Sequence, residues 1–163
     1  MTLAKLGTIA LIGLAGIAAT PASAQQWEVI TQPGGYKVAR VELAGSFTGI
    51  AITCERNVPM LALNLAKSPK RNPAQVTLAT GGAPVGFAVK RNANTNVWFA
   101  TIKDNRVLTM LSEGQSVAVT VDGVNYGSAS LAGSDQAMRG ALTGCWKPPA
   151  TIAAALGTTA APG

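Results

Sequence analysis

Two cysteines carry the most clearly defined chemistry in this sequence. Cys54 and Cys145 are its only cysteines, and they lie far apart along the chain. An even number of cysteines in an exported protein indicates a disulfide, because the compartments outside the cytoplasm are oxidising. A redox-active or metal-binding pair would instead need the close spacing of a Cys-x-x-Cys motif. The sequence therefore predicts one structural disulfide between Cys54 and Cys145.

A group of cations provides the second candidate chemistry. Lys67, Lys70 and Arg71 fall in a segment interrupted by Ser-Pro and Asn-Pro, and Lys90 and Arg91 lead into another turn. If both turns lie at the same end of the molecule, these side chains form a patch that attracts an anionic ligand or partner. The alternative is that they are solvated turns that keep a basic protein soluble.

Catalytic chemistry finds little support. The chain contains no histidine, which excludes Ser-His-Asp and Cys-His nucleophilic pairs and histidine-ligated zinc. Among the carboxylates, Glu42 and Glu55 are candidates to meet on neighbouring strands, although solvated strand residues are the simpler interpretation. Asp122 precedes a glycine in a predicted turn and Asp135 starts a predicted helix. We therefore expect no catalytic residues, no cofactor and no metal site.

Two further patterns have a structural and a functional interpretation. The segment 81–86 is rich in glycine but lacks the Gly-Lys-Ser/Thr ending of a phosphate-binding loop, so we expect a hairpin connection. The large aromatic side chains are candidates for a carbohydrate-stacking platform, but in a chain with so few of them we expect core positions. These residues are Trp27, Trp98, Trp146, Phe87 and Phe99.

The N-terminal segment predicts export. It combines a positive charge at Lys5, an uncharged apolar run and small residues of the Ala-x-Ala kind that end at Ala24. This pattern is typical of a secretory signal peptide, and its apolar run is shorter than the roughly 20 residues that span a bilayer. Cleavage lowers the formal net charge from +6 to +5 by removing Lys5. We expect a signal peptide at 1–24 and a periplasmic or secreted protein without a later membrane span.

Short extended segments separated by turn residues dominate the rest of the chain. Alternation of apolar and polar residues with period two indicates half-buried strands. We predict ten strands, at 27–31, 36–43, 48–54, 60–65, 75–79, 86–90, 97–102, 106–111, 116–121 and 126–131. With brief turns between them, they favour a mainly β domain, an antiparallel sandwich or barrel over 25–147.

One helix is expected near the end of this domain. Ser134 can cap it, Asp135 suits the positive first turn, and Met138, Leu142 and Cys145 form an apolar stripe. The predicted disulfide would then hold this helix against the inner face of an early strand. Beyond it, 148–163 contain mostly Ala, Thr, Gly and Pro and no charge, which predicts a mobile tail.

The C-terminal part of this domain resembles a known family. A mature start near Trp27 and a late strand that runs into a small-residue helix, through residues 126–134, Ala137, Ala141 and Leu142, resemble the invasion-associated locus B family of exported bacterial proteins. The ending at Cys145 is also similar to accessory periplasmic proteins of type VI secretion. This resemblance implies a β-sandwich-like envelope protein without known catalysis.

Three functions are compatible with these sequence features. The first is a non-enzymatic envelope binding module for an anionic envelope component or a protein partner. Its exported location argues against nucleic acid as the partner. The second is a secreted inhibitor of a protease or lysozyme, which would present a rigid loop at Asn92–Asn96. The third is an enzyme that uses carboxylates or a lysine in a shared cleft.

Overall fold

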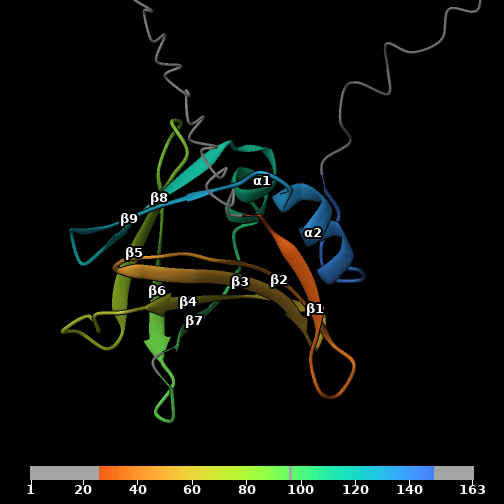
Figure 1. Ribbon diagram of the computed structural model, residues 1–163, viewed down its shortest axis with the longest axis horizontal. Helices are drawn as coiled ribbons and strands as arrows, with labels where there is room; N and C mark the ends of the chain where they lie inside the picture. Colours follow the sequence, from red (N-terminus) through yellow and green to blue (C-terminus); the bar gives the residue numbers. More distant parts are fainter. Residues whose placement is uncertain (1–25, 96, 149–163) are drawn as a thin grey trace, which may run out of the picture.

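The computed structural model describes residues 26–95 and 97–148, and these form a mainly antiparallel β structure with two helices (Figure 1). The predicted signal peptide at 1–24 lies outside the described residues, and so does the predicted tail apart from Pro148. The helices are α1 (Asn105–Glu113) and α2 (Ser134–Ala141). The strands are β1 (Glu28–Thr31), β2 (Lys37–Glu42), β3 (Phe47–Glu55), β4 (Val58–Leu65), β5 (Ala74–Ala79), β6 (Val85–Arg91), β7 (Val97–Thr101), β8 (Ser116–Val121) and β9 (Val124–Ser130).

The described strands form one sheet that curls into a half-barrel. Its order is β1-β2-β3-β4-β7-β6-β5-β8-β9, and every neighbouring pair is antiparallel. One half of the sheet consists of β1, β2, β3, β4 and β7, and the other consists of β6, β5, β8 and β9. The two halves join through a short β6–β7 ladder that pairs Lys90 with Phe99 and Arg91 with Trp98. Figure 1 shows the half with β8 and β9 lying over the half with β2, β3 and β4. The prediction of antiparallel β structure is therefore confirmed in its general form.

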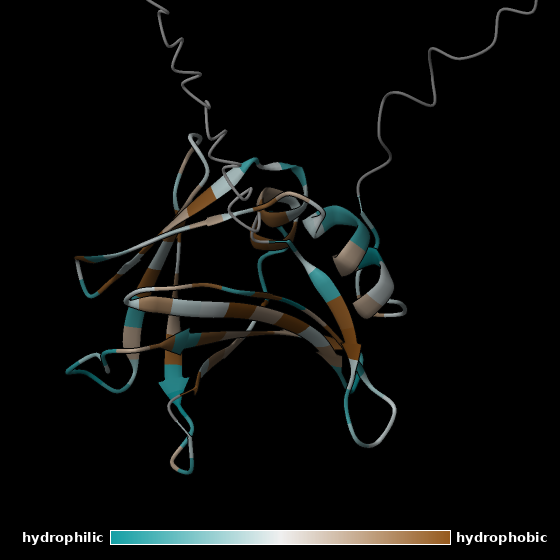
Figure 2. Cartoon of the chain, in the orientation of Figure 1, coloured by the Kyte–Doolittle hydropathy of each residue, from teal (hydrophilic) through white to brown (hydrophobic). Residues whose placement is uncertain are grey.

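The inner face of this sheet is made by the alternating apolar residues. Leu61, Leu63 and Leu65 of β4 are buried while Ala62 and Asn64 between them face outward, as the period of a strand requires. Figure 2 shows apolar colour on the strands and on α1, and polar colour at the turns. The core therefore lies inside the curl, between the two halves of the sheet and the helices.

The predicted strand at 106–111 is wrong, because this segment belongs to helix α1. Asp104 caps the helix, since its side chain accepts a hydrogen bond from the Arg106 N–H at 2.9 Å. The buried residues Val107, Leu108 and Leu111 recur at helical spacing and face the core. The apolar residues of this segment therefore fit both the two-residue period of a strand and the 3.6-residue period of a helix, and the Asp104 cap favours the helix.

Helix α2 is confirmed, but two details of the prediction are wrong. Its N-cap is Gly133 at φ 81°, and Ser134 is fully buried with its hydroxyl 2.7 Å from the carbonyl oxygens of Leu111 and Leu131. Ser134 thus connects α2 to α1 instead of capping α2. The helix ends at Ala141, so Cys145 lies in the turn beyond it.

The predicted disulfide between Cys54 and Cys145 is confirmed. Cys54 lies at the end of β3, on the same side of the strand as the buried residues Ile50 and Ile52, and is itself half-buried. The bond joins the sheet to the turn after α2 across 91 positions of sequence. Of the helices in the described residues, neither is long and apolar enough to cross a membrane.

Removing the disulfide should lower stability. Because the bond closes a loop of 91 positions, we expect the Cys54→Ser/Cys145→Ser double variant to lose about 2–5 kcal/mol of unfolding free energy. Urea unfolding followed by tryptophan fluorescence measures this loss. Thiol titration of the native protein should detect no free thiol, and unchanged stability of the double variant would contradict the role assigned to the bond.

A tight contact at Gly114 allows a second test of the fold. A Cβ added there would lie 2.8 Å from both the Leu131 Cδ1 and the Met110 carbonyl oxygen, whereas a Cβ at Gly82 would meet nothing within 4 Å. We expect Gly114→Ala to destabilise the protein by about 1–3 kcal/mol through overpacking. Gly82→Ala is the matched control and should unfold at the same urea concentration as the wild type. Equal stability of the two variants would show that the contact is not restrictive.

Candidate anion-binding site

The loop that connects β4 to β5 borders a cleft of about 680 Å³ on the described surface. Lys67, Lys70 and Arg71 line it from this loop, and all three are exposed. Asp122 and Tyr126 line it from the β8–β9 hairpin. The structure thus brings three of the five predicted cations to one cleft, opposite a hairpin that lies far from them in sequence. We call these residues and their surroundings the basic cleft.

Hydrogen bonds fix both sides of the basic cleft. At one end of the β4–β5 loop, Ala66 donates its N–H to the Ser46 carbonyl at 3.0 Å. On the opposite wall, the Asp122 N–H donates to the Gln75 carbonyl at 2.8 Å, and the Gln75 N–H donates to Asp122 Oδ1 at 2.9 Å. This reciprocal pair attaches the tip of the hairpin to β5, so the cleft has walls of defined position.

The hairpin tip confirms the predicted turn at Asp122-Gly123. These two residues have φ of 49° and 80°, and they connect the paired residues Val121 and Val124. A two-residue hairpin loop with both residues at positive φ is a type I′ turn, which strongly favours Asp-Gly. Asp122 therefore occupies the wall of the cleft because a type I′ turn favours aspartate at this position.

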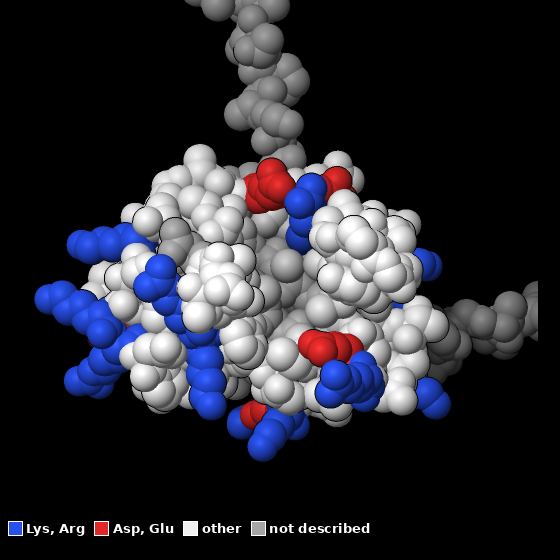
Figure 3. All heavy atoms as spheres, turned by 90° about the horizontal axis from the view of Figure 1, so that it is seen from below, with Lys and Arg blue, Asp and Glu red and all other residues white. Residues whose placement is uncertain are grey.

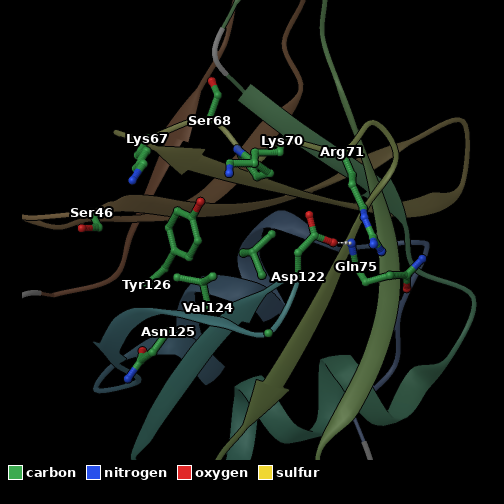
Figure 4. A pocket seen from close by; sticks show the side chains of 13 residues that line it. Ser46, Lys67, Ser68, Lys70, Arg71, Gln75, Asp122, Val124, Asn125 and Tyr126 are labelled. Atoms are coloured by element: carbon green, nitrogen blue, oxygen red, sulfur yellow. Dashed lines mark hydrogen bonds between the residues drawn. The ribbon is translucent and has the colours of Figure 1, made fainter.

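Asp122 and Tyr126 extend from the hairpin toward the loop with the lysines (Figure 4). Burial raises the pKa of Tyr126 above its usual value of 10.0, and the negative charge of Asp122 raises it further. The phenol therefore stays protonated at neutral pH and can donate a hydrogen bond. Asp122 Oδ2 is out of contact with solvent and has no hydrogen-bond partner within the described residues.

The positive charge at the basic cleft is not neutralised by ion pairs. Among residues 26–95 and 97–148, the ion pairs join Arg40, Arg106 and Arg139 to nearby carboxylates, and none includes Lys67, Lys70 or Arg71. Figure 3 shows basic side chains projecting together from the end of the molecule where the β4–β5 loop lies in Figure 1. Part of the excess positive charge of the chain therefore lies at this end of the molecule.

Lys90 and Arg91 lie beside the loop but do not line the cleft. The Arg91 N–H donates to Asn72 Oδ1 at 3.2 Å, which places the end of β6 next to the residue that follows Arg71. Both side chains are exposed at the corner where the two halves of the sheet join. The two basic segments therefore lie close together, which a shared patch requires, and Lys90 and Arg91 are neighbours of the cleft.

The carbohydrate platform considered from the sequence does not form. Trp27, Trp98 and Trp146 are all buried, at 5%, 1% and 8% exposure. Phe87 is half-buried, and Phe99 is exposed on the outer face of β7 beside Lys90. The core interpretation therefore holds for the three tryptophans.

Other residues that were candidates for chemistry take structural positions. Glu42 pairs with Gly49 and Glu55 with Val58, so the two carboxylates lie at opposite ends of β3. The hairpin predicted at 81–86 is present, with residues 80–84 connecting β5 to β6 and the last two residues of the segment inside β6. In the described part of the chain, no group of three or more Cys, Asp or Glu side chains gathers in a way that could hold a metal ion.

Comparisons of the chain with protein-family models, with curated proteins and with solved structures found no match. The resemblance to exported envelope proteins therefore rests on the sequence features that suggested it. The chemistry of the basic cleft accordingly follows from its own residues.

Sequence reasoning identified the cations of the basic cleft but missed Tyr126 and the role of Asp122 in its wall. Tyr126 belongs to a predicted strand and Asp122 to a predicted turn, and neither pattern specifies a neighbour. The contact arises because β8 pairs with β5, which follows the basic loop directly. Only the strand order brings the two sides together.

The ionisation of Tyr126 can be measured directly. The chain contains two tyrosines, and alkaline titration of tyrosinate absorbance should include a transition above 10.0 that is absent in Tyr126→Phe. Because the folded-state pKa is raised, this residue's contribution to stability is complete below pH 10.0 and is lost as pH rises through its folded pKa. A late transition that persists in the variant would refute the assignment.

Proposed function

We propose that this protein is an exported, non-enzymatic binding module that captures an anionic ligand in the basic cleft. The observation that carries the proposal is the arrangement of Lys67, Lys70 and Arg71, which are exposed, line one cleft and form no ion pair with any described residue. The ligand is an anionic component of the cell envelope, and the predicted export signal and the disulfide suit a periplasmic or secreted location.

Electrostatics supports binding at this position over general attraction to a basic surface. Cations along a concave wall act together on a ligand, and the low-dielectric protein behind them concentrates the field in the cleft. Arg71 presents a planar fork of donors that suits carboxylate or phosphate, whereas the two lysines act as point charges. The neutral phenol of Tyr126 adds a donor on the opposite wall.

A second candidate function is inhibition of an extracellular protease or lysozyme by the β6–β7 hairpin. Figure 1 shows this hairpin projecting beyond the sheet. Its described part is held by local hydrogen bonds, since Asn92 Oδ1 accepts the Asn94 N–H at 3.0 Å and the Asn92 N–H donates to the Val97 carbonyl at 2.9 Å. A protruding loop whose described part is held by its own hydrogen bonds suits an inhibitor, because such a loop loses less conformational entropy on binding.

The anion-binding proposal predicts a position-specific charge effect. In the variant Lys67→Gln/Lys70→Gln/Arg71→Gln, affinity for polygalacturonate and for poly-γ-glutamate should fall about tenfold, because three ion pairs are lost and each contributes up to about 1 kcal/mol. Isothermal titration calorimetry at low ionic strength measures both affinities. Binding should also weaken as salt is added, since exposed charges are screened.

The matched control removes the same charge elsewhere. Lys37, Lys103 and Lys147 are exposed and do not line the cleft, so Lys37→Gln/Lys103→Gln/Lys147→Gln should retain most of the affinity. Equal losses in the two triple variants would mean that net charge alone causes the binding. Stoichiometric inhibition of a protease or lysozyme that both variants retain would favour the second candidate.

A further inference from the structure

The basic cleft contains more than cations, and the additional groups restrict the ligand. One carboxylate, Asp122, belongs to the same wall as the phenol of Tyr126. Side-chain amides and hydroxyls, among them Asn125 and Ser68, complete the lining. A site for a densely charged anion would gain nothing from a carboxylate in its wall, because like charges repel. The mixture suits a ligand that has anionic groups and neutral hydrogen-bond donors together.

Asp122 has one oxygen already used and one without a partner. Oδ1 accepts the Gln75 N–H at 2.9 Å, whereas Oδ2 has no donor within the described residues and no contact with solvent. A buried acceptor without a donor costs free energy. A ligand hydroxyl that displaces the groups now covering this oxygen would supply the donor.

Tyr126 provides the complementary half of the site. Figure 4 shows its ring projecting from the hairpin toward the loop that carries Lys67. The ring is half-buried and packs against the core, so its position is fixed, and its raised pKa keeps the hydroxyl protonated. An amphipathic ring of this kind offers an apolar surface to the C–H groups of a ligand and a donor at its tip. The apolar Val124, which is 60% exposed, extends this surface along the rim.

We propose that the ligand of the basic cleft is an acidic carbohydrate, whose carboxylates meet Lys67, Lys70 and Arg71 while a sugar hydroxyl donates to Asp122 and a sugar ring lies against Tyr126. This inference rests on the proposed function, which supplies the cationic half of the site. The volume of about 680 Å³ is within the range of small-ligand sites. This site differs from the aromatic platform considered from the sequence, since none of those five aromatic residues lines the cleft.

The experiment compares two probes of equal charge and unlike chemistry. Trigalacturonate and a C-terminally amidated, N-acetylated triglutamate carry the same number of carboxylates, but only the first has ring hydroxyls. In calorimetric titration of the full exported protein, trigalacturonate should bind about tenfold more tightly than triglutamate. This difference is the effect expected of one hydrogen bond to a charged group. Equal or tighter binding of triglutamate would overturn the inference.

Asp122→Asn provides the sharper variant. Asparagine is tolerated at positive φ and keeps the oxygen that accepts the Gln75 N–H, so the turn should be preserved. We expect this variant to bind trigalacturonate about tenfold more weakly, because the charge-assisted bond is lost. It should bind triglutamate more tightly, because a repulsive charge is removed. A change in the same direction for both probes would contradict the role of Asp122.

Further measurements separate this inference from the proposed function. Tyr126→Phe tests the donor and Tyr126→Leu tests the ring, and both should weaken trigalacturonate binding more than triglutamate binding. If both probes bind with equal affinity and both require Lys67, Lys70 and Arg71, the acidic-sugar inference fails and the anion-binding proposal stands. If neither probe binds but phosphatidylglycerol vesicles do, through the same three cations, the ligand is a lipid headgroup and the inference fails.

Discussion

The fold depends on closing a sheet that has two free edges. Strands β1 and β9 are the edges of the sheet, and a curled sheet with exposed edges leaves part of its inner face open to water. The Trp27 indole N–H, just before β1, donates to the carbonyl of Ser130 at the end of β9 at 2.9 Å. This bond joins the two edges directly. Helix α2 follows β9 and packs against β1 and β2, and the Cys54–Cys145 disulfide fixes the turn beyond it to β3.

The same closure explains why the cleft lies where it does. Strand β9 begins at the Asp-Gly turn and ends near Trp27, so its two ends have different surroundings. At the Ser130 end the indole and α2 fill the space between the edges with apolar side chains, including the fully buried Met138. At the other end the hairpin faces the exposed basic loop across a hollow that neither described helix lines. The cleft therefore lies at the end of the sheet that these helices do not cover.

The sequence predicted those features that depend on local patterns. Alternation located nine strands, and the Asp-Gly pair and the two cysteines indicated a turn and a disulfide that the structure confirms. Alternation failed at 106–111, where Val107 and Leu111 satisfy a helical spacing that the Asp104 cap selects. The cations of the site were recognised by type, but Tyr126 was not, because the pairing of β5 with β8 joins segments that are separated by β6, β7 and α1. A pattern of single residues carries no information on such a pairing.

Cations with ion-pair partners and cations without them occupy different parts of the described surface, and ion pairing for stability does not explain this difference. Arg40 bridges Glu28 and Glu42 on neighbouring strands, and Arg139 pairs with Asp135 along α2, so these cations stand beside carboxylates. Such exposed pairs contribute little to stability, about 0–1 kcal/mol each. Lys67, Lys70 and Arg71 lack even this compensation among the described residues and repel one another within a single loop. Because the repulsion disfavours the observed arrangement in the free protein, an anion that binds there relieves it. Relief of that repulsion would therefore favour the anion binding proposed for this loop.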